Sequence, residues 1–237
     1  MLDFHTHVLP GIDDGSKDLE TTKKMLEIMK RQGVSRVAAT PHFYYDEITL
    51  DGFLERRNNA AEAVYKSIEK NNRPEIALGA EVNFFYGLEM LENSEKLCLE
   101  GTNLMLVELP FGNWDARVYS TLSMLKRARD ITPVVAHYDR YLQFNPLRES
   151  LDRIVETGAL IQCNTSFFLS FMTRHKALRM FQSGCVQFIG SDCHNLDSRK
   201  PNYSDAVDVI YKKLGDRAID DLGFWEHAVI SDDAGFR

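Results

Sequence analysis

Short apolar runs alternate with longer amphipathic stretches along nearly the whole chain, and this alternation restricts the fold more than any other feature. Several of the short runs are almost continuously apolar, as parallel strands buried on both faces must be. The expected strands are Met1–His5, Val34–Thr40, Glu75–Val82, Asn103–Glu108, Thr132–His137, Ala159–Cys163 and Val186–Gly190.

The intervening stretches have the pattern of helices. Residues 18–32, for example, place Leu19, Leu26 and Met29 on one face and stop at Gly33, a residue typical of the position after a helix. About seven β-then-α units without a break predict one α/β domain. The expected helices are Asp18–Gln32, Leu50–Asn71, Asp115–Arg129, Pro146–Thr157, Arg174–Ser183 and Ser204–Leu222.

The closure of the sheet and the extent of the domain are also predicted. Because no GxGxxG turn follows the first strand, a closed barrel is favoured over an open doubly wound sheet. We expect a single domain over residues 1–237. Residues 223–237 would be a C-terminal extension of it, either a contact for a partner or a docked tail.

Composition excludes several classes of protein. The 237 residues include 28 Lys and Arg against 35 Asp and Glu, and the net charge of −7 argues against nucleic-acid and membrane-surface binding. No apolar run approaches the roughly 20 residues that a membrane span needs, and the first residues do not resemble a secretory signal. The four cysteines form no CxxC pair, which indicates a reduced, cytoplasmic protein.

Imidazoles and carboxylates follow six of the seven expected strands. In a parallel α/β barrel the carboxyl ends of the strands meet at one face, where active sites are built. A single histidine in this set would be an ordinary polar residue, but five histidines and four acids at one face indicate a polynuclear metal site. The nine candidate metal ligands are His5, His7, Asp14, His42, Glu81, Glu108, His137, Asp192 and His194.

The ligand types narrow the choice of metal. Imidazole and carboxylate without thiolate suit manganese, iron or zinc in a catalytic centre. Nine ligands exceed what one ion needs, so we expect two or three ions, with Mn²⁺ as the first choice and Fe or Zn as alternatives.

Five short stretches carry a resemblance to a known superfamily. They resemble the PHP (polymerase and histidinol phosphatase) superfamily, and within it the metal-dependent protein-tyrosine phosphatases of bacterial capsule and exopolysaccharide loci. The first stretch, HTHVLPGIDDG, is specific to that subgroup. The stretches are His5–Gly15, Thr40–His42, Gly79–Val82, Glu108–Pro110 and Ser191–Asn195.

This resemblance implies a distorted (β/α)7 barrel of the TIM type and a division of the ligands among three ions. The activity it implies is hydrolysis of phosphotyrosine by metal-activated hydroxide, on a tyrosine autokinase that controls polysaccharide export. In the implied division His5, His7, Glu81 and Asp192 hold one ion, Glu81 bridges to a second held by Glu108 and His137, and Asp14, His42 and His194 hold a third.

Two arginines are candidates to grip the phosphate. Arg140 follows His137 by three residues and Arg199 follows His194 by five, and either could fork onto phosphoryl oxygens or form an ion pair instead. The segment from His137 to Arg140 departs from the usual His-Pro-Glu-Arg of the superfamily. The loop after His42 also lacks the usual glycine-containing turn, so the substrate is less firmly indicated than the chemistry.

Three other functions stay open from the sequence. One is a small-molecule phosphatase such as histidinol phosphatase, and another is a metal-stabilised binding module without turnover. The third is a cysteine nucleophile, because Cys193 and Arg199 have the C-x5-R spacing. The five intervening residues include no glycine and one acid, which disfavours a phosphate-binding loop there. The sequence indicates no oligomeric state.

Overall fold

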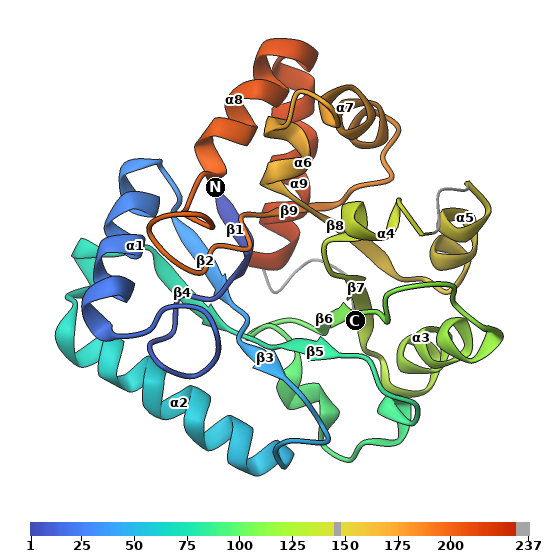
Figure 1. Ribbon diagram of the computed structural model, residues 1–237, viewed down its shortest axis with the longest axis horizontal. Helices are drawn as coiled ribbons and strands as arrows, with labels where there is room; N and C mark the ends of the chain where they lie inside the picture. The colour runs from blue at the N-terminus through green and yellow to red at the C-terminus, as the bar shows by residue number, and fades with distance from the viewer. Residues whose placement is uncertain (145–147, 231–237) are drawn as a thin grey trace.

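The computed structural model describes residues 1–144 and 148–230, and in it parallel strands form a barrel (Figure 1). Each expected strand is present, with ends shifted by one or two residues. The expected strand over residues 75–82 is wrong in one respect, because Gly79 and Ala80 interrupt it. The strands are β1 (Leu2–Thr6), β2 (Arg36–Ala39), β3 (His42–Phe43), β4 (Glu75–Leu78), β5 (Glu81–Asn83), β6 (Leu104–Glu108), β7 (Thr132–Val135), β8 (Leu160–Asn164) and β9 (Phe188–Gly190).

Seven strand positions make up the barrel. The hydrogen-bonded orders are β1-β2-β4 and β3-β5-β6-β7-β8-β9, with β3 and β5 continuing the positions of β2 and β4. The residues after β9 join it to β1, since Asp192 N–H donates to His5 O at 2.8 Å and His7 N–H donates to Cys193 O at 3.0 Å. The predicted α/β barrel is therefore confirmed. It is distorted where two strand positions are interrupted, between β2 and β3 and between β4 and β5.

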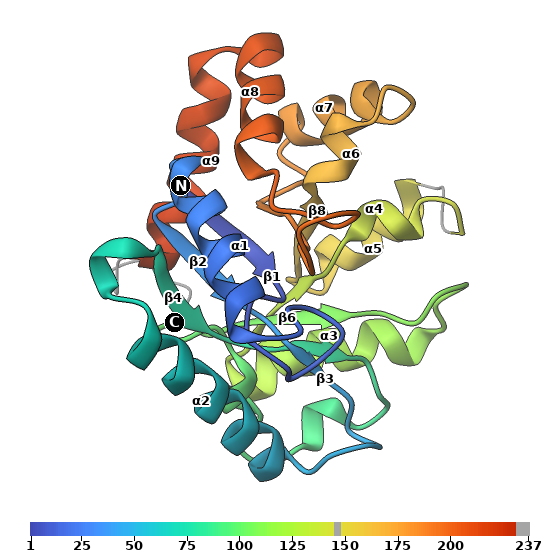
Figure 2. The same ribbon diagram turned by 60° about the vertical axis from the view of Figure 1, so that its left-hand side comes forward.

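Helices surround the strands, α1 and α2 on one side, α3 and α5 on another, and α6 to α9 on a third (Figures 1 and 2). The prediction of one helix over residues 204–222 is wrong, because Gly215 adopts a φ of +78° and divides it into α8 and α9. The helices are α1 (Leu19–Arg31), α2 (Leu50–Ser67), α3 (Ala116–Arg129), α4 (Tyr138–Tyr141), α5 (Arg148–Glu156), α6 (Thr165–Leu169), α7 (Arg174–Gln182), α8 (Tyr203–Leu214) and α9 (Asp216–Ile230), with 3₁₀ turns at Lys70–Asn72, Leu88–Met90 and Ser94–Leu97.

A small apolar cluster fills the end of the barrel where the strands begin. Val229 and Trp225 of α9 pack against this cluster, and the Trp225 ring meets Phe188 edge-on at 6.0 Å. The described part of the segment 223–237 thus belongs to a helix packed on the barrel, and residues 231–237 lie outside the described residues. The strand residues of the cluster are Leu2, Phe4, Ala38, Ala77, Leu104, Leu106, Val134 and Phe188.

The same inward rows become polar toward the carboxyl ends of the strands. Because alternate residues of a strand share a face, the residue two positions after an inward-facing apolar residue also faces inward. These rows are Ala38-Thr40-His42, Ala77-Gly79-Glu81, Leu104-Leu106-Glu108, Leu160-Gln162-Asn164 and Phe188-Gly190-Asp192. The barrel therefore changes from an apolar core to a set of ligands along its own axis.

Strand β1 departs from this alternation. Its register against β2 shifts between Asp3 and Thr6, where three steps in β1 face two steps in β2. The extra residue is a β-bulge, which lets even-numbered Leu2 and Phe4 face inward below it and odd-numbered His5 face inward above it.

Candidate metal centre

Glu81, at the start of β5, lies at the middle of the cluster of candidate ligands. Its Oε2 lies 3.1 Å from His5 Nε2 and 3.2 Å from His7 Nε2. Its Oε1 lies 2.8 Å from His137 Nε2, which is also 3.3 Å from Glu108 Oε1. Glu81 and the three histidines are at most 1% exposed, so one buried carboxylate contacts three imidazoles, two from the end of β1 and one from the end of β7.

A second group lies toward the solvent side. Asp14 Oδ1 is 3.3 Å from His42 Nε2 and 3.4 Å from His194 Nε2. The groups are joined because His42 Nδ1 is 3.1 Å from Glu81 Oε2 and Asp192 Oδ1 is 3.7 Å from His194 Nδ1. The structure thus brings all nine candidate ligands together.

The cluster fits cations better than it fits its own hydrogen bonds. His5 Nε2 and His7 Nε2 face each other at 3.1 Å. His42 Nδ1 and His194 Nε2 are buried near carboxylate oxygens, yet neither forms a hydrogen bond with a described residue. Nitrogen lone pairs directed at one another and at carboxylates are the arrangement that a shared metal ion satisfies.

Protons compete with metal for the same nitrogens. Burial lowers the pKa of His7, but hydrogen bonds with Asp13 and Glu81 outweigh burial and raise it to about 10. Burial and the charge of His7 lower the pKa of His194 to about 4. A metal ion held here would therefore have to replace a proton on His7, whereas His194 is already neutral at pH 7, so binding would release protons.

Both candidate arginines bind the same carboxylate. Arg140 Nη2 donates to Asp192 Oδ2, and Arg199 Nη2 lies 2.6 Å from Asp192 Oδ1. Their side chains are 35% and 37% exposed, whereas that of Asp192 is 3% exposed. The arginines are thus ion-paired at the rim of the centre, with part of each guanidinium facing outward.

The backbone is strained at two of the candidate ligands. His137 and Asp192 have φ values of +32° and +52°, in the left-handed region that residues other than glycine seldom adopt. Such strain concentrates at functional sites, where the surrounding structure holds it in place. Each lies just after its strand.

Residues that the sequence did not assign hold the ligands in place. Asp13 Oδ2 accepts from His7 Nδ1 at 2.8 Å and from His42 N–H at 3.1 Å. Gln162 Oε1 accepts from His5 Nδ1 at 3.2 Å. Gln162 could have been found from its inward position in β8, whereas nothing in the sequence distinguishes Asp13 from the adjacent carboxylate.

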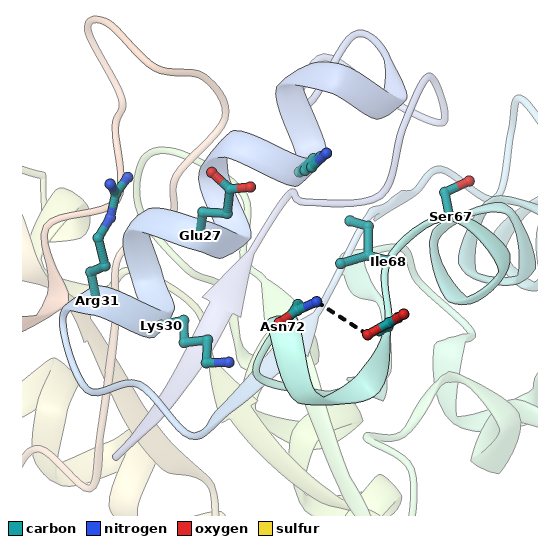
Figure 3. Close-up of a pocket in the computed structure, with 8 residues that line it drawn as sticks. Glu27, Lys30, Arg31, Ser67, Ile68 and Asn72 are labelled. Atoms are coloured by element: carbon teal, nitrogen blue, oxygen red, sulfur yellow. Dashed lines mark hydrogen bonds between the residues drawn. The ribbon is translucent and has the colours of Figure 1, made fainter.

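One pocket lies beside the candidate ligands and a second lies away from them. The first, of 480 Å³, opens beside Asp14 and His42, and the Tyr44 ring stacks on His42 at 5.3 Å there. The second, of 790 Å³, lies between α1 and the end of α2, where Glu27, Lys30 and Asn72 line it (Figure 3). No candidate ligand lines the second pocket, so substrate access is better assigned to the first.

The cysteine alternative is not supported by the position of its thiol. Cys193 is fully buried, and burial and the charge of Asp3 raise the pKa of its thiol well above the ordinary value. Its partner in the C-x5-R spacing, Arg199, is directed at Asp192 instead. A thiolate nucleophile has neither access nor stabilisation here.

The fold is a parallel α/β barrel, and imidazoles and carboxylates cluster at the carboxyl ends of its strands. This combination is typical of barrel proteins with a metal centre. The family model for capsular polysaccharide synthesis, CpsB/CapC, matches residues 1–229, and the chain belongs to this family.

Individual relatives agree with this membership. The chain is 30% identical over 238 residues to the tyrosine-protein phosphatase CpsB of Streptococcus pneumoniae, with 94% of each chain covered. It is 27% identical over 220 residues to the tyrosine-protein phosphatase YwqE of Bacillus subtilis, covering 91% of this chain and 85% of that one.

Solved structures show the same fold. The chain matches a structure from work on YwqE of Bacillus subtilis and CpsB of Streptococcus pneumoniae, described as unique metal-dependent tyrosine phosphatases. The TM-score is 0.82 at 23% identity, with 97% of this chain and 93% of that chain covered. Within the described residues, no helix is both long and apolar enough to cross a membrane.

Proposed function

We propose that this protein is a metal-dependent protein-tyrosine phosphatase, built as a single PHP domain over residues 1–237. The observation that carries the proposal is the position of Glu81, one buried carboxylate within 3.2 Å of ring nitrogens on four histidines. Membership of the CpsB/CapC family, and relatives named as tyrosine-protein phosphatases, support the choice of substrate.

The nine clustered residues would hold the ions in the three sets that the resemblance implies, with Glu81 bridging two of them. We propose Mn²⁺ as the metal, with Fe or Zn as alternatives, because no thiolate contributes to the cluster. When bound, the ions supply Lewis-acid stabilisation of phosphoryl charge and a nucleophilic water at neutral pH.

The protein supplies orientation around the ions. Asp13 and Gln162 fix the rings of His7 and His5 through their Nδ1 atoms, which leaves each Nε2 directed into the centre. The outward parts of Arg140 and Arg199 bind the phosphate of the substrate, since guanidinium groups pair with phosphoryl oxygens in a forked geometry. The partner would be a tyrosine-phosphorylated protein, and we propose a bacterial tyrosine autokinase, with this protein acting in the cytoplasm.

The test combines metal analysis with hydrolysis assays. Purified protein is expected to contain two or three ions per chain, and to hydrolyse a phosphotyrosyl peptide until a chelator is added. Added Mn²⁺ should restore the activity. Hydrolysis by metal-free protein would overturn the proposal, and a higher kcat/KM on histidinol phosphate than on the peptide would favour the small-molecule alternative.

Changing either arginine should weaken the enzyme without emptying the metal centre. For Arg199→Met we expect a fall in kcat/KM on phosphotyrosyl peptide of about 10²-fold, since a charged hydrogen bond to phosphate contributes about 1.5–3 kcal/mol. Arg179→Met, at an exposed position of α7, is the matched control and should leave kcat/KM unchanged. Loss of bound metal from Arg199→Met would show that the arginine acts by holding Asp192.

Replacing the buried cysteine should leave the chemistry intact. Because Cys193 is fully buried and faces away from the ligands, Cys193→Ser at saturating Mn²⁺ should keep kcat within about two-fold of the unmodified enzyme. A hydroxyl in this apolar position lowers the melting temperature instead. A loss of activity by orders of magnitude in folded, metal-loaded Cys193→Ser would restore the cysteine mechanism.

A further inference from the structure

Two buried side-chain amides form a chain of hydrogen bonds that joins three of the candidate ligands, His5, His137 and Asp192. Gln162 and Asn164 occupy successive inward positions of β8 and are 0% and 4% exposed. Gln162 Nε2 donates to Asn164 Oδ1 at 3.1 Å, and Asn164 Nδ2 donates to Asp192 Oδ2 at 2.9 Å. At the other end, Gln162 Oε1 accepts from His137 N–H at 2.6 Å and from His5 Nδ1 at 3.2 Å.

The two ends fix the direction of every hydrogen bond in this chain. The backbone N–H of His137 can only donate, so the amide oxygen of Gln162 must face it. The amide nitrogen of Gln162 must then donate to Asn164. The Asp192 carboxylate can only accept, which requires the amide nitrogen of Asn164 at that end, and the two requirements agree.

From this polarity we infer that Gln162 and Asn164 are positioning residues, an amide relay that sets the tautomer of His5 and the orientation of Asp192. Because Gln162 presents an oxygen, His5 carries a proton on Nδ1, and its Nε2, which points at His7 Nε2 and Glu81, is the nitrogen available to a metal. Ligand histidines are commonly fixed through their other ring nitrogen in this way, usually by a carboxylate or a carbonyl.

The surrounding structure gives the relay no other role. Asn164 is the N-cap residue of α6, but its side chain makes no capping hydrogen bond and is used by the relay instead. Its backbone N–H donates to Asp139 Oδ1 at 2.8 Å, which fixes the main chain as well. A Cβ on Gly190 would lie 2.9 Å from Gln162 Nε2, so this glycine provides the space that the relay occupies.

The relay contacts only part of the centre. Its hydrogen bonds reach His5, His137 and Asp192, and among the described residues none of them joins it to Asp14 or His42. Losing it should therefore weaken ions held by the first group more than an ion held by the solvent-side group. The inference rests on the metal centre proposed above, but not on the identity of the substrate.

The test measures metal binding and the His5 ring directly. Gln162→Met keeps the length of the side chain and removes all of its hydrogen bonds. We expect its affinity for Mn²⁺, followed by the electron paramagnetic resonance of the free ion, to fall about 10–100-fold for at least one ion. In zinc-loaded protein with ¹⁵N-labelled histidine, the slowly exchanging Nδ1–H signal of His5 should disappear.

Two further variants separate the relay from simple packing. Ile161→Val, on the opposite face of β8, should lower the melting temperature slightly and leave both readouts unchanged. Asn164→Ala removes the hydrogen bond to Asp192 and the one from Gln162 Nε2, but it leaves the contacts of Gln162 Oε1 with His5 and His137. Mn²⁺ affinity should therefore fall while the His5 signal persists, and this variant serves if Gln162→Met does not fold.

The outcomes distinguish the relay from the proposed function. Unmodified protein that binds no metal would refute the metal centre itself. Unmodified protein that binds metal, together with folded Gln162→Met and Asn164→Ala variants of equal affinity and an unchanged His5 signal, would overturn the relay alone.

Discussion

Replacing the central carboxylate, in Glu81→Gln, should abolish hydrolysis of phosphotyrosyl peptide while leaving the fold intact. Burial alone would raise the pKa of Glu81, but the charge of His5 and hydrogen bonds from the surrounding histidines hold it well below the ordinary value. The group is therefore an anion in the middle of the cluster. An amide keeps the shape but removes the charge that cations require.

The expected loss is at least about 10³-fold in kcat, because metal ions contribute several kcal/mol to stabilising the transition state. Elemental analysis should show fewer ions per chain. Glu75→Gln is the matched control, since Glu75 begins the same strand position, is exposed, and should tolerate the same change without effect. Full activity in Glu81→Gln with its metal retained would contradict the bridging role.

The substitution Gly190→Ala, which adds one methyl group, should disrupt both the fold and the metal centre. A Cβ there would lie 2.4 Å from His5 Cβ, closer than such atoms pack in proteins, and 3.0 Å from His5 N. Since backbone and the Cβ of a strand cannot move aside as a flexible side-chain end can, we expect a loss of about 3 kcal/mol, at the upper end for overpacked cores. For a chain of this size this lowers Tm by about 6–12 °C.

Gly223→Ala is the opposite control. Gly223 lies within α9, and nothing lies within 4 Å of a Cβ built there. Alanine is about 1 kcal/mol more favourable than glycine inside a helix, so Tm should rise or stay unchanged. If thermal melts of the two variants shifted equally, the close approach of β9 to His5 would not be a constraint.

The hydrophobic pattern and the strand ends were enough to predict one α/β domain and the location of the candidate ligands, whereas the (β/α)7 barrel itself followed from the family resemblance. The period-2 pattern carries this information, because inward residues of β2, β4, β6 and β9 lead directly to His42, Glu81, Glu108 and Asp192. Gly79 interrupts one expected strand without changing the direction of Glu81, so this error did not affect the ligand set.

The parts that could not be predicted depend on contacts between distant segments. The ion pairs of Arg140 and Arg199 with one carboxylate, and the contact of Asp13 with His7, follow from loop conformations that no local pattern specifies. The left-handed backbone of His137 is likewise stabilised by its surroundings, including the Gln162 side chain.

The bulge in β1 makes the length of a very short segment matter as much as its residues. Before the bulge the even-numbered residues of β1 face the barrel interior, and after it the odd-numbered residues do. A packing residue and a metal ligand can therefore be adjacent in the chain and both face the interior. Deleting Phe4, which lies between Asp3 and Thr6, would turn the histidine pair toward the helices while leaving the HTH triplet unchanged. In a relative that keeps the triplet but lacks the extra residue, the two histidines would thus point out of the barrel toward the helices.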